Sequence, residues 1–324
     1  MVIKCNSDKI RYTGRWNINE SSATSTANGN YFEFMYSGEC AVIGFDTSYL
    51  RVPFPHIYIS VDGGANIEVS LDRFIRISAK KGVHKVCVIL KSSVETQHRW
   101  FAPIEAKVSL LEIEADEFVN LPEDMRPTIE FIGDSITEGI AIDMGYINYG
   151  NNGDMVYFDD STAGYAWLTA KILNFRPIIM GYGSLGTTRG GAGGIPPVAE
   201  SYKYYSNKNP MESQQADFIV INHGTNDRGA DKEFFKEKYF DFLGIVRERN
   251  PLSKIISLTP FSGCLAKEIK EVVEKFNKEK DDAVFYVDTT GWIEPEPLHP
   301  TRDGHKTISE KLSKIIKANA IQTW

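Results

Sequence analysis

Apolar and polar residues alternate along the first 120 residues of the chain. Phe32, Phe34 and Tyr36 share one side of such a stretch, and the pattern repeats in three further stretches: 57–61, 67–71 and 86–90. A period of two is typical of β-strands with one buried face. The tripeptide Asp62-Gly63-Gly64 separates two of these stretches and predicts a hairpin turn. No helical pattern interrupts the series, so residues 1–120 are predicted to form an all-β domain, a β-sandwich of jelly-roll type.

The pattern changes after the proline-bearing segment 121–127, which we interpret as a linker. Five short apolar runs follow it, at residues 129–132, 178–180, 218–221, 255–258 and 284–287. Amphipathic helical patterns lie between most of these runs, and the clearest two span 235–246 and 265–276. Helices that alternate with apolar strands predict a parallel sheet covered on both faces. Residues 128–324 are therefore expected to form an α/β domain with a doubly wound, five-stranded parallel sheet.

Composition and charge narrow the range of partners. The formal net charge is -7, and Lys and Arg are spread along the chain, so nucleic acid and anionic membranes are not expected as partners. The four cysteines lie far apart without zinc-type spacing, which predicts reduced thiols and no metal site. Without a signal-peptide pattern the chain as written is expected to be cytoplasmic, although a removed leader would leave the same sequence. The sequence leaves a homo-oligomer open.

Residues that could carry chemistry follow several of the predicted strands. Gly133-Asp134-Ser135 comes directly after the first strand. Ser135 opens a Ser-x-x-Glu pattern, which is also typical of a helix capping box without a catalytic role. In a doubly wound sheet, however, ligands bind at the carboxyl ends of the strands. The residues at the other strand ends therefore decide between the two interpretations.

Three further strand ends complete a set of catalytic groups. Gly186 follows the second strand, Asn226 follows the third, and His299 follows the fifth. A serine esterase needs a nucleophilic hydroxyl, a base within hydrogen-bond reach, and donors that stabilise the oxyanion. Ser135 and these three residues supply that set. The combination is far more specific than any one member.

These segments resemble the sequence blocks of the SGNH (GDSL-type) hydrolase family, in the family's order, over most of the chain after residue 127. The resemblance implies a flavodoxin-like catalytic domain in which Ser135 is the nucleophile and His299 the general base. It also implies an oxyanion hole made by the backbone amides of Ser135 and Gly186 and by the side chain of Asn226. A carboxylic ester hydrolase is the activity that it implies.

The chain departs from this family at the third member of the triad. The family usually has aspartate three residues before the histidine, whereas this chain has Glu296. We expect Glu296 to orient His299, with Glu294 or a backbone carbonyl as the alternatives. We also expect activity to rise with pH as His299 loses its proton near the reference pKa of about 6.5.

A β-sandwich ahead of an SGNH domain resembles the two-domain carbohydrate esterases that remove acetyl groups from plant polysaccharides such as xylan. The resemblance implies an acetylated carbohydrate, such as acetylated xylan or a xylo-oligosaccharide, or another small ester as substrate. Two other functions stay open. One is a general short-chain carboxylesterase or lipase-like GDSL hydrolase, and the other is an inactive carbohydrate-binding protein.

The spacing of Gly181, Gly183 and Gly186 also matches a dinucleotide-binding fingerprint. That fingerprint requires a helix to begin at this point. Instead, the glycine-rich segment 190–197 follows and ends in two prolines, a composition that disfavours a helix. We therefore reject an oxidoreductase and expect no cofactor.

Overall fold

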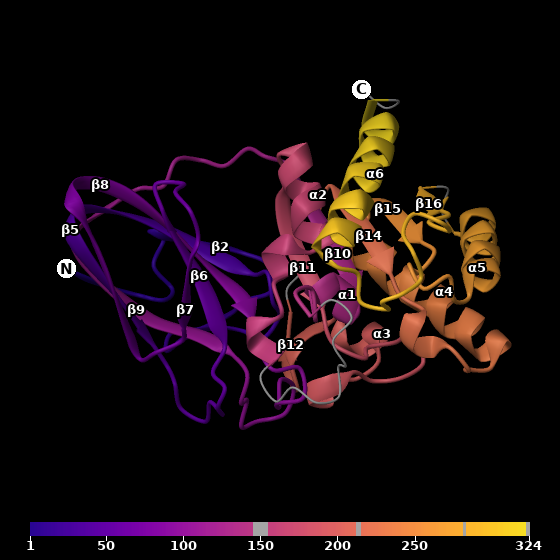
Figure 1. The fold of residues 1–324 in the computed structure, drawn as a ribbon, viewed down its shortest axis with the longest axis horizontal. Helices are drawn as coiled ribbons and strands as arrows, with labels where there is room; N and C mark the ends of the chain where they lie inside the picture. Colours follow the sequence, from indigo (N-terminus) through magenta and orange to yellow (C-terminus); the bar gives the residue numbers. More distant parts are fainter. Residues whose placement is uncertain (145–154, 212–214, 281–282, 322–324) are drawn as a thin grey trace.

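The computed structural model describes residues 1–144, 155–211, 215–280 and 283–321 of the chain. An N-terminal β region (residues 1–120) lies beside a C-terminal α/β region (residues 128–324), as Figure 1 shows. Strand β9 ends at Val119 and strand β10 begins at Thr128, so the predicted linker lies between two strands. None of the described helices is long and apolar enough to span a bilayer.

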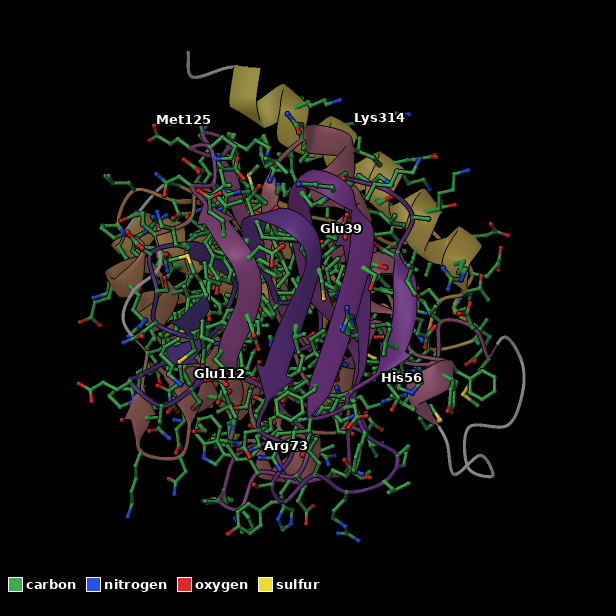
Figure 2. The ribbon with its side chains drawn as sticks, turned by 90° about the vertical axis from the view of Figure 1, so that its left-hand side faces the viewer. Glu39, His56, Arg73, Glu112, Met125 and Lys314 are labelled. Carbon is green, nitrogen blue, oxygen red and sulfur yellow. The ribbon has the colours of Figure 1, made fainter. Side chains whose placement is uncertain are left out.

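The β region is one antiparallel sheet that encloses an aromatic core. Its strands are β1 (Val2–Lys4), β2 (Ile10–Thr13), β3 (Asn17–Ile18), β4 (Ala23–Ser25), β5 (Tyr31–Phe45), β6 (His56–Val61), β7 (Ile67–Ser70), β8 (Phe74–Ser92) and β9 (Val108–Val119). Strand β5 pairs with β8 throughout, while its residues 31–34 also pair with β2 and residues 35–45 with β9. Figure 2 looks along the long axis of the molecule onto these strands.

The predicted core-facing side of β5 is confirmed, although Tyr31 and Glu33 on its other face are buried as well. Phe32, Phe34 and Tyr36 are fully buried. The predicted hairpin joins β6 to β7, and Asp62 and Gly63 both have positive φ, as a tight hairpin turn requires. Ile67 differs from the pattern because it lies on the edge strand β7, and its side chain is exposed.

The α/β region contains the predicted five-stranded parallel sheet. The strands are β10 (Thr128–Gly133), β11 (Arg176–Gly181), β14 (Phe218–Asn222), β15 (Lys254–Leu258) and β16 (Val284–Val287), in the order β11-β10-β14-β15-β16. This is the flavodoxin-like order, in which the second strand lies on one side of the first strand and the later strands lie on the other side. A small hairpin of β12 (Tyr204–Ser206) and β13 (Asn209–Pro210) lies apart from the sheet.

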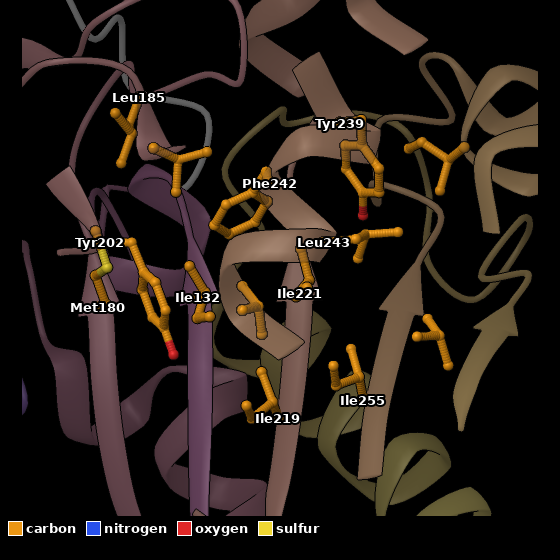
Figure 3. Packing of buried hydrophobic residues seen from close by; sticks show 14 of the residues in the cluster. Ile132, Met180, Leu185, Tyr202, Ile219, Ile221, Tyr239, Phe242, Leu243 and Ile255 are labelled. Atoms are coloured by element: carbon orange, nitrogen blue, oxygen red, sulfur yellow. The ribbon is translucent and has the colours of Figure 1, made fainter. Parts of the chain in front are cut away.

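Helices cover both faces of this sheet. They are α1 (Ser135–Glu138), α2 (Tyr165–Leu173), α3 (Val198–Ser201), α4 (Lys232–Arg249), α5 (Ala266–Glu279) and α6 (Arg302–Ile321), with single 3-10 turns η1 (Met155–Tyr157), η2 (Ser161–Ala163), η3 (Ala192–Gly194) and η4 (Thr225–Asp227). Helices α4 and α5 bury their predicted apolar stripes on one face, and α2 and α6 pack on the other. Figure 3 shows Tyr239, Phe242 and Leu243 of α4 against the strand residues. The predicted doubly wound fold is confirmed.

Two buried ion pairs join the β region to the α/β region. Arg15 Nη1 lies 4.0 Å from Glu130 Oε1, and Arg99 Nη1 bonds to Glu138 Oε1; all four side chains are at most 4% exposed. Glu130 is a charged residue in a strand that was expected to be apolar, and it also accepts a hydrogen bond from Tyr202. Since loss of one partner would leave a buried charge unpaired, the two regions depend on each other for stability.

Candidate active site

The predicted nucleophile begins helix α1, just after strand β10, which lies between β11 and β14 in the sheet. Asp134 caps this helix, since its Oδ1 accepts a hydrogen bond of 3.0 Å from the Ile136 amide. Ser135 is therefore the first residue of the helix and not its cap. Glu138 does not close a capping box either, because it is buried against Arg99 and Asn28. The capping-box interpretation of Ser135 is wrong.

The structure brings Ser135 and His299 together from positions 164 residues apart. His299 Nε2 lies 2.8 Å from Ser135 Oγ, within hydrogen-bond distance. His299 lies in the loop between β16 and α6, so it reaches the serine from another strand end. Burial, helped by the positive charge of Arg228, lowers the pKa of His299 to about 4. The imidazole is thus neutral at neutral pH and can accept the hydroxyl proton, and its pKa lies below the value of about 6.5 expected from the sequence.

Asn226 lies in the η4 turn after β14, where its amide is held beside the nucleophile. Its Nδ2 donates to the Leu185 carbonyl at 3.0 Å and to Asp134 Oδ2 at 3.3 Å. Burial raises the pKa of Asp134 to about 7. The longer of the two bonds is the weaker, so an oxyanion could replace Asp134 as the acceptor without moving the side chain far.

Gly186 lies in the loop after β11, and its position depends on close contact with Asp227. A Cβ atom at Gly186 would lie 2.8 Å from Asp227 Oδ1, so only glycine fits without a shift. Asp227 also accepts hydrogen bonds from the Thr187 and Thr188 amides at 2.9 and 2.7 Å, which ties the glycine loop to the asparagine loop. The Gly186 amide itself donates to the Arg189 carbonyl at 3.1 Å. As an oxyanion donor it would have to share or release that bond.

The two candidate acids lie in the same loop as His299, between β16 and α6. Glu294 and Glu296 are exposed, and among the described residues no hydrogen bond or ion pair joins either one to His299. Among the described residues, burial and the positive charge of Arg228 are the causes of the lowered pKa of His299. The role expected for Glu296 stays a prediction.

Ser135, Asn226 and His299 line one cavity of about 190 Å³, together with Glu95, Ile136, Ser184, Thr225 and Leu298. Thr225 is adjacent to Asn226 in the sequence and Leu298 is adjacent to His299, so both belong to motifs identified in the sequence. Ser184 lies inside the glycine segment that we examined as a nucleotide fingerprint. Glu95 carries no sequence signal, because it belongs to the β region and reaches the cavity only through the packing of the two regions.

Two other histidines near the site are packing residues. His223 is fully buried, with its ring edge-on to Phe242. His305 Nδ1 accepts a hydrogen bond of 3.0 Å from the Tyr165 amide, and its ring stacks on that tyrosine. Among the described residues, no group of three His, Cys, Asp or Glu side chains could hold a metal ion.

Solved structures with the same two-region architecture cover nearly the whole chain. A family two carbohydrate esterase from Cellvibrio japonicus matches with a TM-score of 0.81 at 21% identity, over 98% of this chain and 97% of its own. One from Clostridium thermocellum in complex with cellohexaose matches with a TM-score of 0.78 at 24% identity, over 96% and 99%. The acetyl xylan esterase Est2A from Butyrivibrio proteoclasticus matches with a TM-score of 0.78 at 20% identity, over 99% of both chains.

A search of curated proteins gives no match. Residues 131–307, more than half of the chain, match the GDSL-like lipase/acylhydrolase family. The match spans Ser135, Gly186, Asn226 and His299, and it confirms the family and the class of carboxylic ester hydrolase predicted from the sequence. The protein therefore belongs to the GDSL-like lipase/acylhydrolase family.

Proposed function

We propose that the protein is a serine esterase that removes acetyl groups from carbohydrates, with xylan or xylo-oligosaccharides as the first substrates to test. The observation that carries the proposal is the 2.8 Å contact between His299 Nε2 and Ser135 Oγ in a small, mostly polar cavity. The names of similar solved structures support a carbohydrate substrate, because they include an acetyl xylan esterase and an esterase in complex with cellohexaose.

The proposed reaction follows from the order of these groups. Ser135 Oγ attacks the acyl carbon while His299 Nε2 takes its proton, and the negative charge develops on the former carbonyl oxygen. The Ser135 and Gly186 amides and Asn226 Nδ2 stabilise that oxygen. His299 then returns the proton to the leaving sugar hydroxyl. Water, activated by the same imidazole, releases acetate from Ser135.

The size and lining of the cavity favour a short acyl group. Its volume of about 190 Å³ is below the several hundred Å³ typical of sites for larger ligands. Its lining has hydroxyl, amide, imidazole and carboxylate groups and only two aliphatic side chains, Ile136 and Leu298. A long acyl chain would find little apolar surface there.

Two assays test the proposal. Wild-type protein should release acetate from acetylated xylo-oligosaccharides, and it should cleave 4-nitrophenyl acetate faster than the butyrate and octanoate esters. Ser135→Ala should release acetate from neither class of substrate. Faster cleavage of octanoate would indicate a lipase-like enzyme. Binding of xylo-oligosaccharides without any ester hydrolysis would indicate the carbohydrate-binding protein that the sequence left open.

A further inference from the structure

One part of the cavity wall comes from the β region. Glu95 lies three residues after the end of strand β8, and its half-buried side chain lines the same cavity as Ser135 and Asn226. All other described residues that line this cavity belong to the α/β region. An ionised carboxylate only accepts hydrogen bonds. The β region thus adds a hydrogen-bond acceptor to the cavity that contains Ser135, Asn226 and His299.

Gly183 makes room for this carboxylate. A Cβ atom on Gly183 would lie 1.8 Å from Glu95 Oε2, so any side chain there would displace the carboxylate. The Arg99 amide also donates to the Gly193 carbonyl at 2.9 Å, which joins the Glu95 segment to the glycine-rich loop. The contact between the two regions therefore explains a glycine that also fitted a nucleotide fingerprint.

Buried hydrogen bonds hold the segment that carries Glu95. Arg99 Nη2 donates to the Ser93 carbonyl at 3.0 Å, and Ser93 Oγ donates to Asn28 Oδ1 at 3.0 Å. Arg99 Nη1 also bonds to Glu138, which belongs to helix α1. Ser135 begins helix α1, and Arg99 bonds the segment that carries Glu95 to the same helix. The position of Glu95 is therefore linked to that of the nucleophile.

We propose that Glu95 determines specificity for the alcohol part of the ester, by accepting a hydrogen bond from a free hydroxyl group beside the scissile acetyl group. The inference rests on the proposed function, since partly acetylated sugars present such hydroxyls. A hydrogen bond to a charged acceptor is stronger than one between neutral groups. It is also directional, so Glu95 selects sugars by the position of the free hydroxyl.

A pair of matched substrates tests the proposal. One is a mono-acetylated methyl xyloside, and the other is the same ester with its free hydroxyls O-methylated. Wild-type protein should prefer the first in kcat/KM by about 10- to 100-fold, the value of one charged hydrogen bond. Glu95→Gln should lose most of that preference, while its kcat/KM for 4-nitrophenyl acetate, which has no hydroxyl, should change much less.

Two further variants serve as control and second test. Thr96→Ala changes an exposed neighbour of Glu95 and should leave the preference unchanged. Gly183→Ala keeps the charge but displaces the carboxylate, so it should reproduce the loss of preference. Thermal unfolding of each variant reports whether the fold is intact.

The outcomes separate this inference from the proposed function. A folded Glu95→Gln variant with the full wild-type preference overturns the inference alone. Equal loss on 4-nitrophenyl acetate, or a shifted pH profile, also overturns it, because Glu95 would then act through the catalytic groups. Wild-type protein that cleaves 4-nitrophenyl acetate but no acetylated xyloside overturns the proposed function, and the inference with it.

Discussion

The two regions that form the active-site cavity differ in how they hold their side chains. The α/β region presents Ser135 from the start of helix α1, Asn226 from the η4 turn and His299 from a loop. Each of these segments follows a strand, so the parallel sheet itself brings the three residues together. The β region presents Glu95 from a segment that the buried Arg99–Glu138 ion pair and a backbone hydrogen bond from Arg99 to Gly193 fix to the α/β region. The groups proposed for the chemistry thus lie in one region, while the helix that carries the nucleophile is held by both.

The largest expected effect concerns the α/β side of this comparison. Ser135→Ala and His299→Ala should each lower kcat for 4-nitrophenyl acetate by about 10⁴- to 10⁶-fold, because nucleophile and base act as one unit. The double variant should be little worse than either single variant. Circular dichroism and thermal unfolding should show an unchanged fold. Near-normal kcat in folded Ser135→Ala would refute the assignment of the nucleophile.

The next prediction breaks the contact between the two regions. Arg99→Met leaves the buried Glu138 carboxyl without its cation, and burial already raises the pKa of that carboxyl to about 7. The free energy of unfolding should fall by about 3–5 kcal/mol at a pH above the pKa of Glu138, where the unpaired carboxyl is charged, and by less at lower pH, where it is protonated. Arg51→Ala is the matched control, since the Arg51 side chain is 68% exposed and its ion pair should contribute about 1 kcal/mol or less.

Urea denaturation, followed by tryptophan fluorescence, measures both changes. The double variant Arg99→Met/Glu138→Gln should recover part of the lost stability, because no buried charge remains. If Arg99→Met were as stable as Arg51→Ala, the two regions would not depend on this pair. The same dependence argues against a simple deletion of residues 1–120, which would expose Glu130 and Glu138 together.

A third prediction concerns the charge that develops during attack. Asn226→Ala should lower kcat for 4-nitrophenyl acetate by about 10²- to 10³-fold and change KM much less, as loss of one oxyanion donor typically does. Thr225→Ala is a suitable control, because this neighbour lines the cavity but has not been assigned a donor role. A pure KM effect would make Asn226 a substrate-binding residue.

The sequence predicted the site residues of the α/β region, because their positions depend on local and periodic features. Strand periodicity and the residues in the segments that follow the strands predicted Ser135, Asn226 and His299, because parallel strands end at one edge of the sheet. The sequence could not predict the positions of Glu95 and Glu130, for a physical reason. A half-buried or buried carboxylate depends on partners from the other region, and no periodic pattern encodes which surfaces of two regions will meet.

The pH dependence of kcat/KM tests whether His299 has the low pKa that its burial implies. Because burial lowers the pKa of His299 to about 4, the active, neutral form persists to low pH. We expect kcat/KM for 4-nitrophenyl acetate to fall only as pH falls through about 4, not 6.5. Arg228→Gln removes a charge that lowers this pKa, so it should move the acidic limb upward. A pH-stat assay, with activity recovered after return to neutral pH, excludes acid unfolding. A wild-type limb near 6.5 would contradict the buried environment of His299.

The smallest expected effect concerns Glu296. Replacement of a triad carboxylate by an amide has cost as much as about 10⁴-fold in a serine protease, where the acid is buried and bonded to the histidine. Glu296 is exposed and has no described bond to His299. Glu296→Gln should therefore lower kcat by about fivefold or less, the range of an exposed charge interaction. It should also leave the acidic limb of the pH profile in place, since an orienting carboxylate would raise the pKa of the imidazole. Glu294→Gln is the matched control, and both variants should behave alike. A loss of 10²-fold or more in Glu296→Gln alone would instead restore the glutamate as the third member of a triad.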